Sequence, residues 1–285
     1  MAKGASNRKV GIVTFNGDVT VIGDAMSDPQ TISGDKLNDF DYLMTNGKDT
    51  ASKRMLKTVK ETAAKLQKKL MAIEETGPTA LGPAVLTSIA MAAEGKPGST
   101  VVICTDGLAN VGLGAFDEAK TDKQIAEIEV FYERVGQFAK TNGVTINLIS
   151  IEGDECNIGS LSKLAELTGG MVERVNPTNL TKNFANILAL PVIATNVITK
   201  VKLHKGLTFR NELPQNMNEN QTLLVRDFGN VTEDSVFTFE YTIKTIAELI
   251  EMEDLDLTVL KQIPFQAQIS YTALDGSKML RVISK

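Results

Sequence analysis

The segment Val101-Val-Ile-Cys-Thr-Asp-Gly107, together with the earlier Thr76-Gly-Pro-Thr-Ala-Leu-Gly82, indicates the fold of this chain more clearly than any other stretch. The earlier segment is a loop with a hydroxyl group that leads into a helix. The later one is an apolar, β-branched strand that ends on a carboxylate and a glycine. Open α/β folds place their ligands at the carboxyl ends of parallel strands. We therefore expect Thr79 and Asp106 to meet at one end of a parallel sheet.

Strands alternate with helices from this segment outward, up to about residue 190. Apolar strand patterns lie at 10–15, 19–22, 100–105, 144–151 and 171–175. Helices are predicted at 51–75, 81–93, 122–141, 160–168 and 179–190, with Ser160 as a cap of the fourth. The polar, glycine-rich residues 24–50 are expected to be mostly loop. Helices of this length between strands indicate parallel βαβ units, so the predicted fold class is α/β with a doubly wound, mostly parallel sheet.

Two local signals add detail to this outline. Asn16-Gly17 predicts a tight hairpin between the first two strands, because both residues tolerate positive φ. The predicted helix 51–75 has an apolar stripe made of Leu56, Val59, Ala63, Leu66, Leu70 and Ile73. Its other face carries the basic residues Lys53, Arg54, Lys57, Lys60, Lys65, Lys68 and Lys69. A solvated helix face explains these residues, and contact with an anionic membrane surface or an acidic partner is the alternative.

A different pattern begins near Pro191, where the sequence becomes almost purely β. Apolar and polar residues alternate over 237–244 and again over 265–273, and Asp275-Gly276 predicts a hairpin into 279–283. Several strands at short spacing indicate a small all-β sandwich. The predicted domains are therefore residues 9–190 for the α/β part and 191–285 for the sandwich.

Composition excludes several classes of function. The chain has 30 Lys plus Arg against 35 Asp plus Glu, a net charge of −5, whereas nucleic-acid binding proteins usually carry a basic footprint. Two cysteines and one histidine are too few for a disulfide framework or a structural zinc site. The sequence has no apolar run of the length that spans a membrane and no secretory leader pattern. We expect a cytoplasmic protein.

The order of the motifs resembles that of a von Willebrand factor type A domain. The resemblance covers residues 9–190 and is carried by hairpin 10–22, Gly77-Pro-Thr-Ala-Leu81, Val101–Gly107, Val144–Ile151 and Leu164-Ala-Glu-Leu-Thr-Gly-Gly170. Residues 264–282 are similar to the β-sandwich in the trunk of the inner-coat subunits of ER-to-Golgi transport vesicles, and more loosely to stand-alone proteins that join a type A domain to a β-domain. The zinc-finger, all-helical and gelsolin-like modules of coat subunits have no counterpart in this sequence.

The resemblance implies a metal-ion-dependent adhesion site with three contributions. Thr79 matches the loop threonine of the family and Asp106 matches its aspartate after the fourth strand. The family's Asp-x-Ser-x-Ser signature and the central first strand before it have no match, because Asp24-Ala-Met-Ser-Asp28 follows the wrong strand. We therefore expect a chain truncated before the first strand. Mg²⁺ or another divalent cation, which takes about six oxygen ligands, should bind it weakly or not at all.

Simpler explanations exist for each candidate residue. Asp106-Gly107 also fits a strand-end turn, and Thr79 also fits a residue ahead of a helix. His204 lies in an alternating strand pattern, Cys104 inside a core strand, and Cys156 beside two acidic residues that would raise its pKa. The sequence has no phosphate-binding Gly-x-x-x-x-Gly-Lys loop. No catalytic constellation emerges, so the chain is not expected to be an enzyme.

The leading hypothesis is a non-catalytic protein–protein interaction module. Its partner would bind at loops that cluster at the carboxyl ends of the strands and carry Gly77, Thr79, Asp106, Gly107 and Asp154. A cation would assist binding in a complete protein. One alternative is a structural vesicle-coat or scaffold trunk, and another is the substrate-binding part of a larger enzyme such as a ubiquitin ligase.

Overall fold

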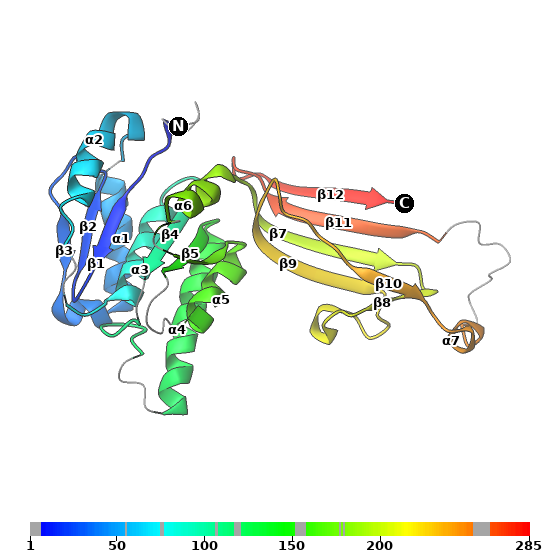
Figure 1. The fold of residues 1–285 in the computed structure, drawn as a ribbon. Coiled ribbons are helices and arrows are strands. Elements are labelled where there is room, and N and C mark those ends of the chain that lie inside the picture. Colours follow the sequence, from blue (N-terminus) through cyan, green and yellow to red (C-terminus); the bar gives the residue numbers. More distant parts are fainter. Residues whose placement is uncertain are drawn as a thin grey trace. The chain divides into compact units, whose positions relative to one another are not determined.

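The computed structural model describes most of the chain as two compact units. The described residues are 7–54, 56–74, 77–105, 108–116, 121–151, 158–176, 178, 180–252 and 263–285. Unit 1 spans Met1–Ala189 and unit 2 spans Leu190–Lys285 (Figure 1). That residues 9–190 and 191–285 are independent domains stays a prediction.

Unit 1 contains two three-stranded sheets instead of one continuous sheet. The antiparallel sheet has the order β1-β2-β3, with β1 at Ile12–Phe15, β2 at Val19–Gly23 and β3 at Gln30–Ile32. The parallel sheet has the order β4-β5-β6, with β4 at Thr100–Thr105, β5 at Thr145–Ile151 and β6 at Val172–Val175. Within the described residues, no strand joins β1 to β4.

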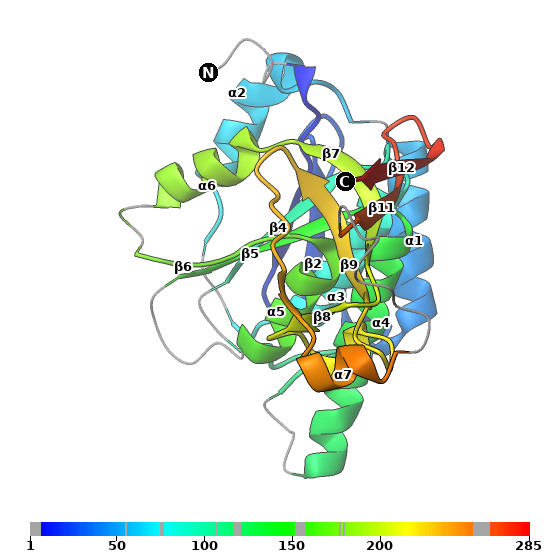
Figure 2. The ribbon, with the colours of Figure 1, turned by 90° about the vertical axis from the view of Figure 1, so that its right-hand side faces the viewer.

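Within its described residues, unit 1 has six α-helices around these sheets. They are α1 Phe40–Lys53, α2 Val59–Leu70, α3 Leu81–Ala93, α4 Asp122–Thr141, α5 Ile158–Thr168 and α6 Leu180–Ala189, and the 3₁₀ helix η2 spans Gly34–Asn38. One core cluster combines side chains from both sheets with side chains of α1, α3, α4 and α5. A second cluster packs α6 on the opposite face of the parallel sheet (Figure 2). Helices on both faces of a parallel sheet confirm the doubly wound α/β class.

Helix α3 is enclosed by the other elements of unit 1, and its sequence is apolar on every face. Nearly every residue from Leu81 to Ala90 is buried, which is the pattern of a helix enclosed on all sides. Glycine permits two of its close contacts. A Cβ on Gly82 would lie 1.9 Å from the Leu113 carbonyl oxygen, and a Cβ on Gly47 of α1 would lie 2.7 Å from the Thr87 carbonyl oxygen. Backbone therefore packs directly on backbone at both positions.

Two expectations for residues 24–75 were wrong. The expected loop at 24–50 contains β3, η2 and α1. The expected single helix 51–75 is two helices, since α1 ends at Lys53 and α2 begins after Thr58, whose side chain forms a capping box with Glu61. The basic residues therefore do not share one helix face. The apolar stripe is also poorly buried, because Leu66 is enclosed but Leu70 and Ile73 are about half exposed.

Two further details differ from the expectations. The hairpin between β1 and β2 forms at Asn16-Gly17, yet neither residue adopts positive φ. Asn16 Oδ1 instead accepts a hydrogen bond from the Asp18 amide, and Gly17 leaves room for Pro78, whose Cγ would lie 3.2 Å from a Cβ at that position. Ser160 lies inside α5 and is buried, so it is not the cap.

Unit 2 is a small antiparallel β structure, as the alternating sequence predicts. Its strands are β7 Val192–Leu203, β8 Leu207–Arg210, β9 Leu223–Thr232, β10 Glu240–Ile243, β11 Phe265–Thr272 and β12 Lys278–Ser284, with η4 at Pro214–Asn216 and α7 at Ile246–Ile250. A four-stranded sheet has the order β12-β11-β7-β9, and β10 pairs with β8. Val201 and Leu224 of the larger sheet share a core with Phe209 of the smaller one, which gives a sandwich.

The hairpin predicted at the end of unit 2 is confirmed. Strands β11 and β12 pair in register from Gln266 with Ser284 to Thr272 with Lys278. Gly276 adopts a φ of +89°, and the Ser277 amide donates to the Asp275 carboxylate. This is the turn chemistry that Asp-Gly favours between strands.

Candidate binding loops at the strand ends

Thr79 lies in a loop that is hydrogen-bonded both to the residue after β1 and to the segment 108–116 that follows β4. Its carbonyl oxygen accepts hydrogen bonds from the amides of Asn110 at 3.0 Å and Val111 at 3.3 Å, in the segment that follows β4. Its own amide donates to the Asn110 side-chain oxygen. The next amide, that of Ala80, donates to the Asn16 carbonyl oxygen at 2.7 Å. The backbone of the loop ahead of α3 is therefore fixed to the residue after β1 and to the segment that follows β4.

The Thr79 side chain takes no part in this network among the described residues. It is half-buried, and no hydrogen bond of its hydroxyl is found within that part of the chain. Gly77, two residues earlier, is exposed and adopts a φ of +72°. The loop therefore combines a fixed backbone with a hydroxyl group and an exposed turn, which suits recognition of a ligand group.

The segment 108–116 is packed closely against α3 and α4. Gly112 adopts a φ of +77°, and a Cβ there would lie 2.7 Å from Pro83 Cγ. Gly114 has a φ of +76°, and its carbonyl oxygen accepts a hydrogen bond from the Tyr132 hydroxyl at 3.1 Å. Burial raises the pKa of that hydroxyl, so it remains a donor. The segment 108–116 is thus held in one conformation by close packing and by the hydrogen bond from Tyr132.

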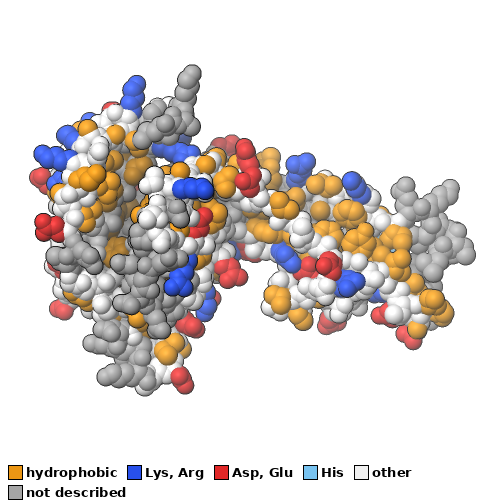
Figure 3. Space-filling model, in the orientation of Figure 1, with side chains coloured by type: hydrophobic (Ala, Val, Ile, Leu, Met, Phe, Trp, Pro, Cys, Tyr) orange, Lys and Arg blue, Asp and Glu red, His pale blue; other side chains and the backbone are white. Residues whose placement is uncertain are grey.

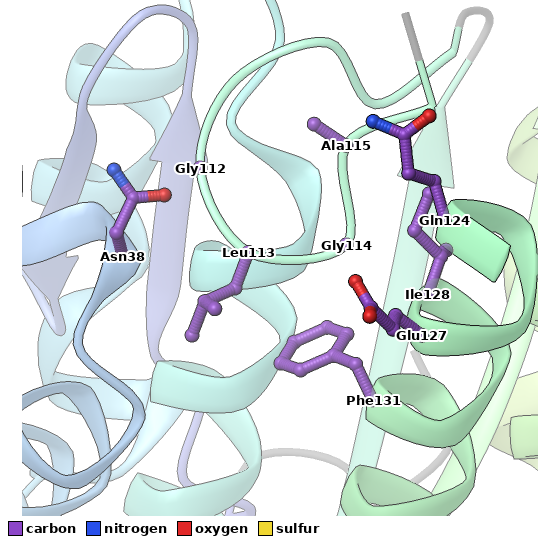
Figure 4. Close-up of a pocket in the computed structure, with 9 residues that line it drawn as sticks. All are labelled: Asn38, Gly112, Leu113, Gly114, Ala115, Gln124, Glu127, Ile128 and Phe131. Atoms are coloured by element: carbon purple, nitrogen blue, oxygen red, sulfur yellow. The ribbon is translucent and has the colours of Figure 1, made fainter. Parts of the chain in front are cut away.

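A shallow pocket borders this segment on the side of α4. It has a volume of about 280 Å³ and lies between residues 112–115, the start of α4 and Asn38. Figure 4 shows the Glu127 carboxylate and the Phe131 ring on one side of the pocket and Asn38 on the other. One carboxylate and two amide side chains line it, without a nucleophile or a basic partner. This arrangement supplies no acid–base pair for catalysis.

Three of the predicted partner-binding residues lie outside the described part of the chain. They are Asp106, Gly107 and Asp154. Within the described residues, no group of three or more His, Cys, Asp or Glu side chains is placed to hold a metal ion. Thr79 contributes one candidate oxygen, while the Asn110 side-chain oxygen already accepts from the Thr79 amide. The described residues alone do not form a cation site, so Mg²⁺ binding at Thr79 and Asp106 stays a prediction.

Asn110 and Asn16 complete the loop network, a role that the sequence pattern did not predict for either residue. The pattern indicated Asn16 only as a turn residue and gave no role to Asn110. The available signal was the position of Asn110, which follows the strand-ending Asp106-Gly107 and precedes two closely spaced glycines. An asparagine in such a loop commonly bonds neighbouring backbone, and here it bonds the loop across the sheet end.

The other candidate residues have structural surroundings. Burial raises the pKa of the Cys104 thiol to about 11, which keeps it protonated and unreactive at neutral pH. His204 follows β7 and accepts a hydrogen bond from the Gly206 amide through Nδ1, so it belongs to a turn and not to a strand. Cys156 lies outside the described residues. No helix among the described residues is long and apolar enough to cross a membrane.

Comparison with known proteins gives one family and several similar chains. Residues 1–187 match the Sec23/Sec24 trunk domain family. A curated relative, Circularly permutated Ras protein 1 from Dictyostelium discoideum, is 34% identical over 281 residues, which are 98% of this chain and 31% of the relative. The chain therefore spans about a third of that relative's length.

Two solved structures share the fold at low sequence identity. The human COPII-coat protein Sec24c superposes with a TM-score of 0.63 and 16% identity, over all of this chain and 38% of that one. A von Willebrand factor type A protein from Catenulispora acidiphila superposes with a TM-score of 0.55 and 15% identity, over 98% of this chain and 57% of that one. Both resemblances stated from the sequence, to type A domains and to the coat trunk, are confirmed.

Proposed function

The chain belongs to the Sec23/Sec24 trunk domain family, and we propose that it is a non-catalytic protein–protein interaction module. Its partner would bind at the loops around Gly77 and Thr79. The observation that supports this most directly is the hydrogen-bonded junction of the Thr79 loop with Asn16 and Asn110. It fixes three loops on a rigid scaffold, and binding residues are often placed on loops of that kind.

The absence of an enzymatic role is part of the proposal. Cys104 is kept protonated by burial, and His204 serves a turn in the other unit. The pocket beside α4 brings together a carboxylate and amides without a basic partner. Neither Cys104, His204 nor the pocket beside α4 thus supplies the nucleophile with an adjacent base that covalent catalysis needs.

A structural coat or scaffold trunk is the second candidate function. Membership of the Sec23/Sec24 trunk family favours it, as does the fold shared with a protein described as a COPII-coat protein. In this case the sheet edges and the sandwich would make assembly contacts. The two functions differ in self-association, because an interaction module is monomeric whereas a scaffold trunk assembles.

A third possibility is that residues 1–285 are the recognition part of a larger protein. The matched region is 31% of a relative named a Ras protein, so in that protein it is joined to further polypeptide. Catalysis would then lie outside this chain. We propose a cytoplasmic location for all three alternatives, and a divalent cation at Thr79 and Asp106 remains an optional aid to binding.

The test compares proteins bound by the wild-type chain and by Thr79→Arg. A long cationic side chain at the half-buried Thr79 would block the loop surface, and the control Glu219→Arg introduces the same side chain at an exposed site in unit 2. We expect Thr79→Arg to weaken binding of the recovered partner by about tenfold or more, and Glu219→Arg to leave it unchanged. If both variants weaken partner binding equally, or if neither variant weakens it, binding at the Thr79 loop is contradicted. Light scattering across a concentration series then separates the monomeric module from the assembling trunk.

A further inference from the structure

Strand β12 forms an open edge of the four-stranded sheet in unit 2. This sheet has the order β12-β11-β7-β9, and within the described residues β12 pairs with β11 alone. The opposite edge is partly covered, because Met217 forms a bridge with Leu224 of β9 and the Asn218 amide donates to the Leu223 carbonyl oxygen. Figure 1 draws β12 as the outermost strand of this sheet. An open edge of this kind can take up a further strand.

The hydrogen bonds between β11 and β12 show which backbone groups point outward. Phe265 and Lys285 exchange both of their backbone hydrogen bonds, at 2.9 and 3.0 Å. The register between the two strands is unbroken, so residues 279, 281 and 283 also bond to β11. The amides and carbonyls at the open edge are therefore those of Leu280, Val282 and Ser284.

Strand β12 has few of the features that usually protect a sheet edge. All residues of Lys278–Ser284 are exposed, none is proline or glycine, and the ladder with β11 has no bulge. Strand β9, by contrast, contains Gly229 and pairs with β7 through several register shifts. Bulges, prolines and charges are what keep natural sheet edges from pairing. Of these, β12 has only the charges of Lys278 and Arg281.

Apolar side chains project from both faces of β12. On one face, Leu280 and Val282 are 64% and 50% exposed. On the other face, Met279 and Ile283 are exposed on either side of Arg281. The core cluster of unit 2 has no member in β12. Figure 3 shows hydrophobic side chains along this edge with Lys and Arg side chains between them. A strand added to β12 would cover apolar surface on both faces.

The charges of β12 indicate the chemistry of the strand that fits it. The hairpin 265–284 has one acidic residue, Asp275, and this lies in the turn. Within the described residues, neither Lys278 nor Arg281 forms an ion pair. A second copy of β12 would bring further positive charge to the edge, and pairing centred on Arg281 would set two guanidinium groups opposite each other. Like charges directly opposite are destabilising, so an acidic strand fits better.

We propose that β12 binds an extended segment of a partner protein in which an acidic residue is flanked on each side by two aliphatic residues. All ladders of this sheet are antiparallel, and in that arrangement the acidic residue lies opposite Arg281. Arg281 bonds to β11, so its pair with the partner is the non-hydrogen-bonded kind, in which side chains approach most closely. The partner's backbone bonds to Leu280, Val282 and Ser284. This surface is separate from the Thr79 loops and does not depend on the partner proposed for them.

The test measures binding of a fluorescein-labelled peptide, Thr-Val-Val-Glu-Ile-Val-Glu, to residues 1–285 by fluorescence anisotropy. A second peptide has lysine in place of the central glutamate. The chain variant Arg281→Glu reverses the charge at the edge. Its matched control, Lys200→Glu, makes the same change in charge at an exposed position of the inner strand β7.

Two methylated peptides test the backbone ladder without any change to the protein. One has an N-methyl group on the valine opposite Val282, whose amide would donate to β12. The other has it on the central glutamate, whose amide would point away from β12. Both peptides keep the same side chains, so a difference between them reports hydrogen bonding at the edge.

We expect Arg281→Glu to weaken binding of the glutamate peptide by about tenfold or more and to strengthen binding of the lysine peptide. Lys200→Glu and Thr79→Arg should change neither by more than about threefold. Methylation of the valine should weaken binding by about tenfold or more, and methylation of the glutamate by less than about threefold.

Strand addition at β12 is overturned if the glutamate peptide does not bind at about 1 mM, or if Arg281→Glu and Lys200→Glu have equal effects. It is also overturned if the two methylated peptides bind equally well. A dimer of residues 1–285 in which the amides of Leu280 and Val282 are protected from hydrogen exchange would overturn it too, because a second copy would then occupy the edge. Unchanged peptide binding by Thr79→Arg keeps this result separate from the test of the Thr79 loops.

Discussion

Single residues decide how closely the segments of unit 1 approach one another. Gly82 is the clearest example, because its missing side chain allows the Leu113 carbonyl to contact the first turn of α3. The same residue type serves another purpose at Gly77, where the space is open and the backbone adopts positive φ. Substitution of these two neighbouring glycines should therefore change the free energy of unfolding by different amounts.

Substitution of these two glycines separates the two effects. Gly82→Ala would place Cβ 1.9 Å from a backbone oxygen, so we expect a loss of about 3 kcal/mol or more in the free energy of unfolding. Gly77→Ala meets no atom within 4 Å and should cost about 1 kcal/mol through its strained φ. Urea unfolding monitored by circular dichroism measures both variants. Equal costs would show that the contact with Leu113 is not the constraint.

The thiol of Cys104 should respond to pH in a defined direction. Burial raises its pKa to about 11 from the usual value of 9.0, so the native state retains a proton that the unfolded state loses. Stability from this group is present below pH 9 and is lost as pH rises toward 11. Alkylation of Cys104 by iodoacetamide in a Cys156→Ser chain should be slow at pH 8 in the native protein and fast in denaturant. Equally fast native labelling would show that the thiol is not protected by burial.

The predicted affinity for a cation at Thr79 depends on how many side chains supply ligands. With Thr79 and Asp106 as the two predicted protein ligands, water would supply most of the roughly six oxygens around Mg²⁺. We expect isothermal titration to show a dissociation constant weaker than about 1 mM, and Asp106→Ala to remove the remaining heat. Micromolar binding by the wild-type chain would mean that other residues complete the site.

At the scale of elements, the capping box of α2 marks where a continuous sequence periodicity is broken. The Thr58 amide and hydroxyl both donate to the Glu61 carboxylate, at 3.1 and 2.7 Å, and these bonds lower the pKa of Glu61. Helix α2 can therefore begin anew a few residues after α1 ends.

Removal of this cap tests its contribution. Thr58→Ala should lower the free energy of unfolding by about 1 kcal/mol, and Thr121→Ala, which removes the matching box of α4, should act similarly. Glu61 is fully exposed, and its lowered pKa means that the cap weakens as pH falls through that pKa. The Thr58→Ala deficit in thermal unfolding should thus shrink in acid. A constant deficit would show that the carboxylate does not take part.

The elements that the sequence predicted correctly are those with strong periodicity. Helices α3 and α4 and strands β4, β11 and β12 have bounds close to the expected ones, because their apolar patterns are uninterrupted. Helix α1 was missed since it contains Asn46 and Gly47, which disfavour helix in isolation. Gly47 is there for the close contact with Thr87 of α3, a tertiary constraint that no local pattern reveals.

The candidate site was predictable in outline but not in its connections. The order of Thr79 and Asp106 along the chain indicated which loop and strand end form it. The bonds that fix Thr79 come from Asn110 and Asn16, and these depend on how three loops meet after folding. Local sequence could not assign partners that are separated by dozens of residues.

At the scale of the whole molecule, the division into two compact units predicts two cooperative transitions. Each unit has its own core, and the boundary between Ala189 and Leu190 lies at the end of α6. Unit 1 has an α/β core and unit 2 rests on a smaller cluster around Val201, Phe209 and Leu224.

Because smaller cores give less stability, the sandwich should unfold first. Calorimetry of residues 1–285 should then resolve two unfolding peaks. Phe209→Ala should lower the temperature of only the first peak, because it should reduce the free energy of unfolding of unit 2 by about 3 kcal/mol or more. Leu86→Ala, the matched change in the fully buried part of α3, should lower only the second. If either substitution shifts both peaks equally, the units unfold as one cooperative body and the predicted domains 9–190 and 191–285 are not independent.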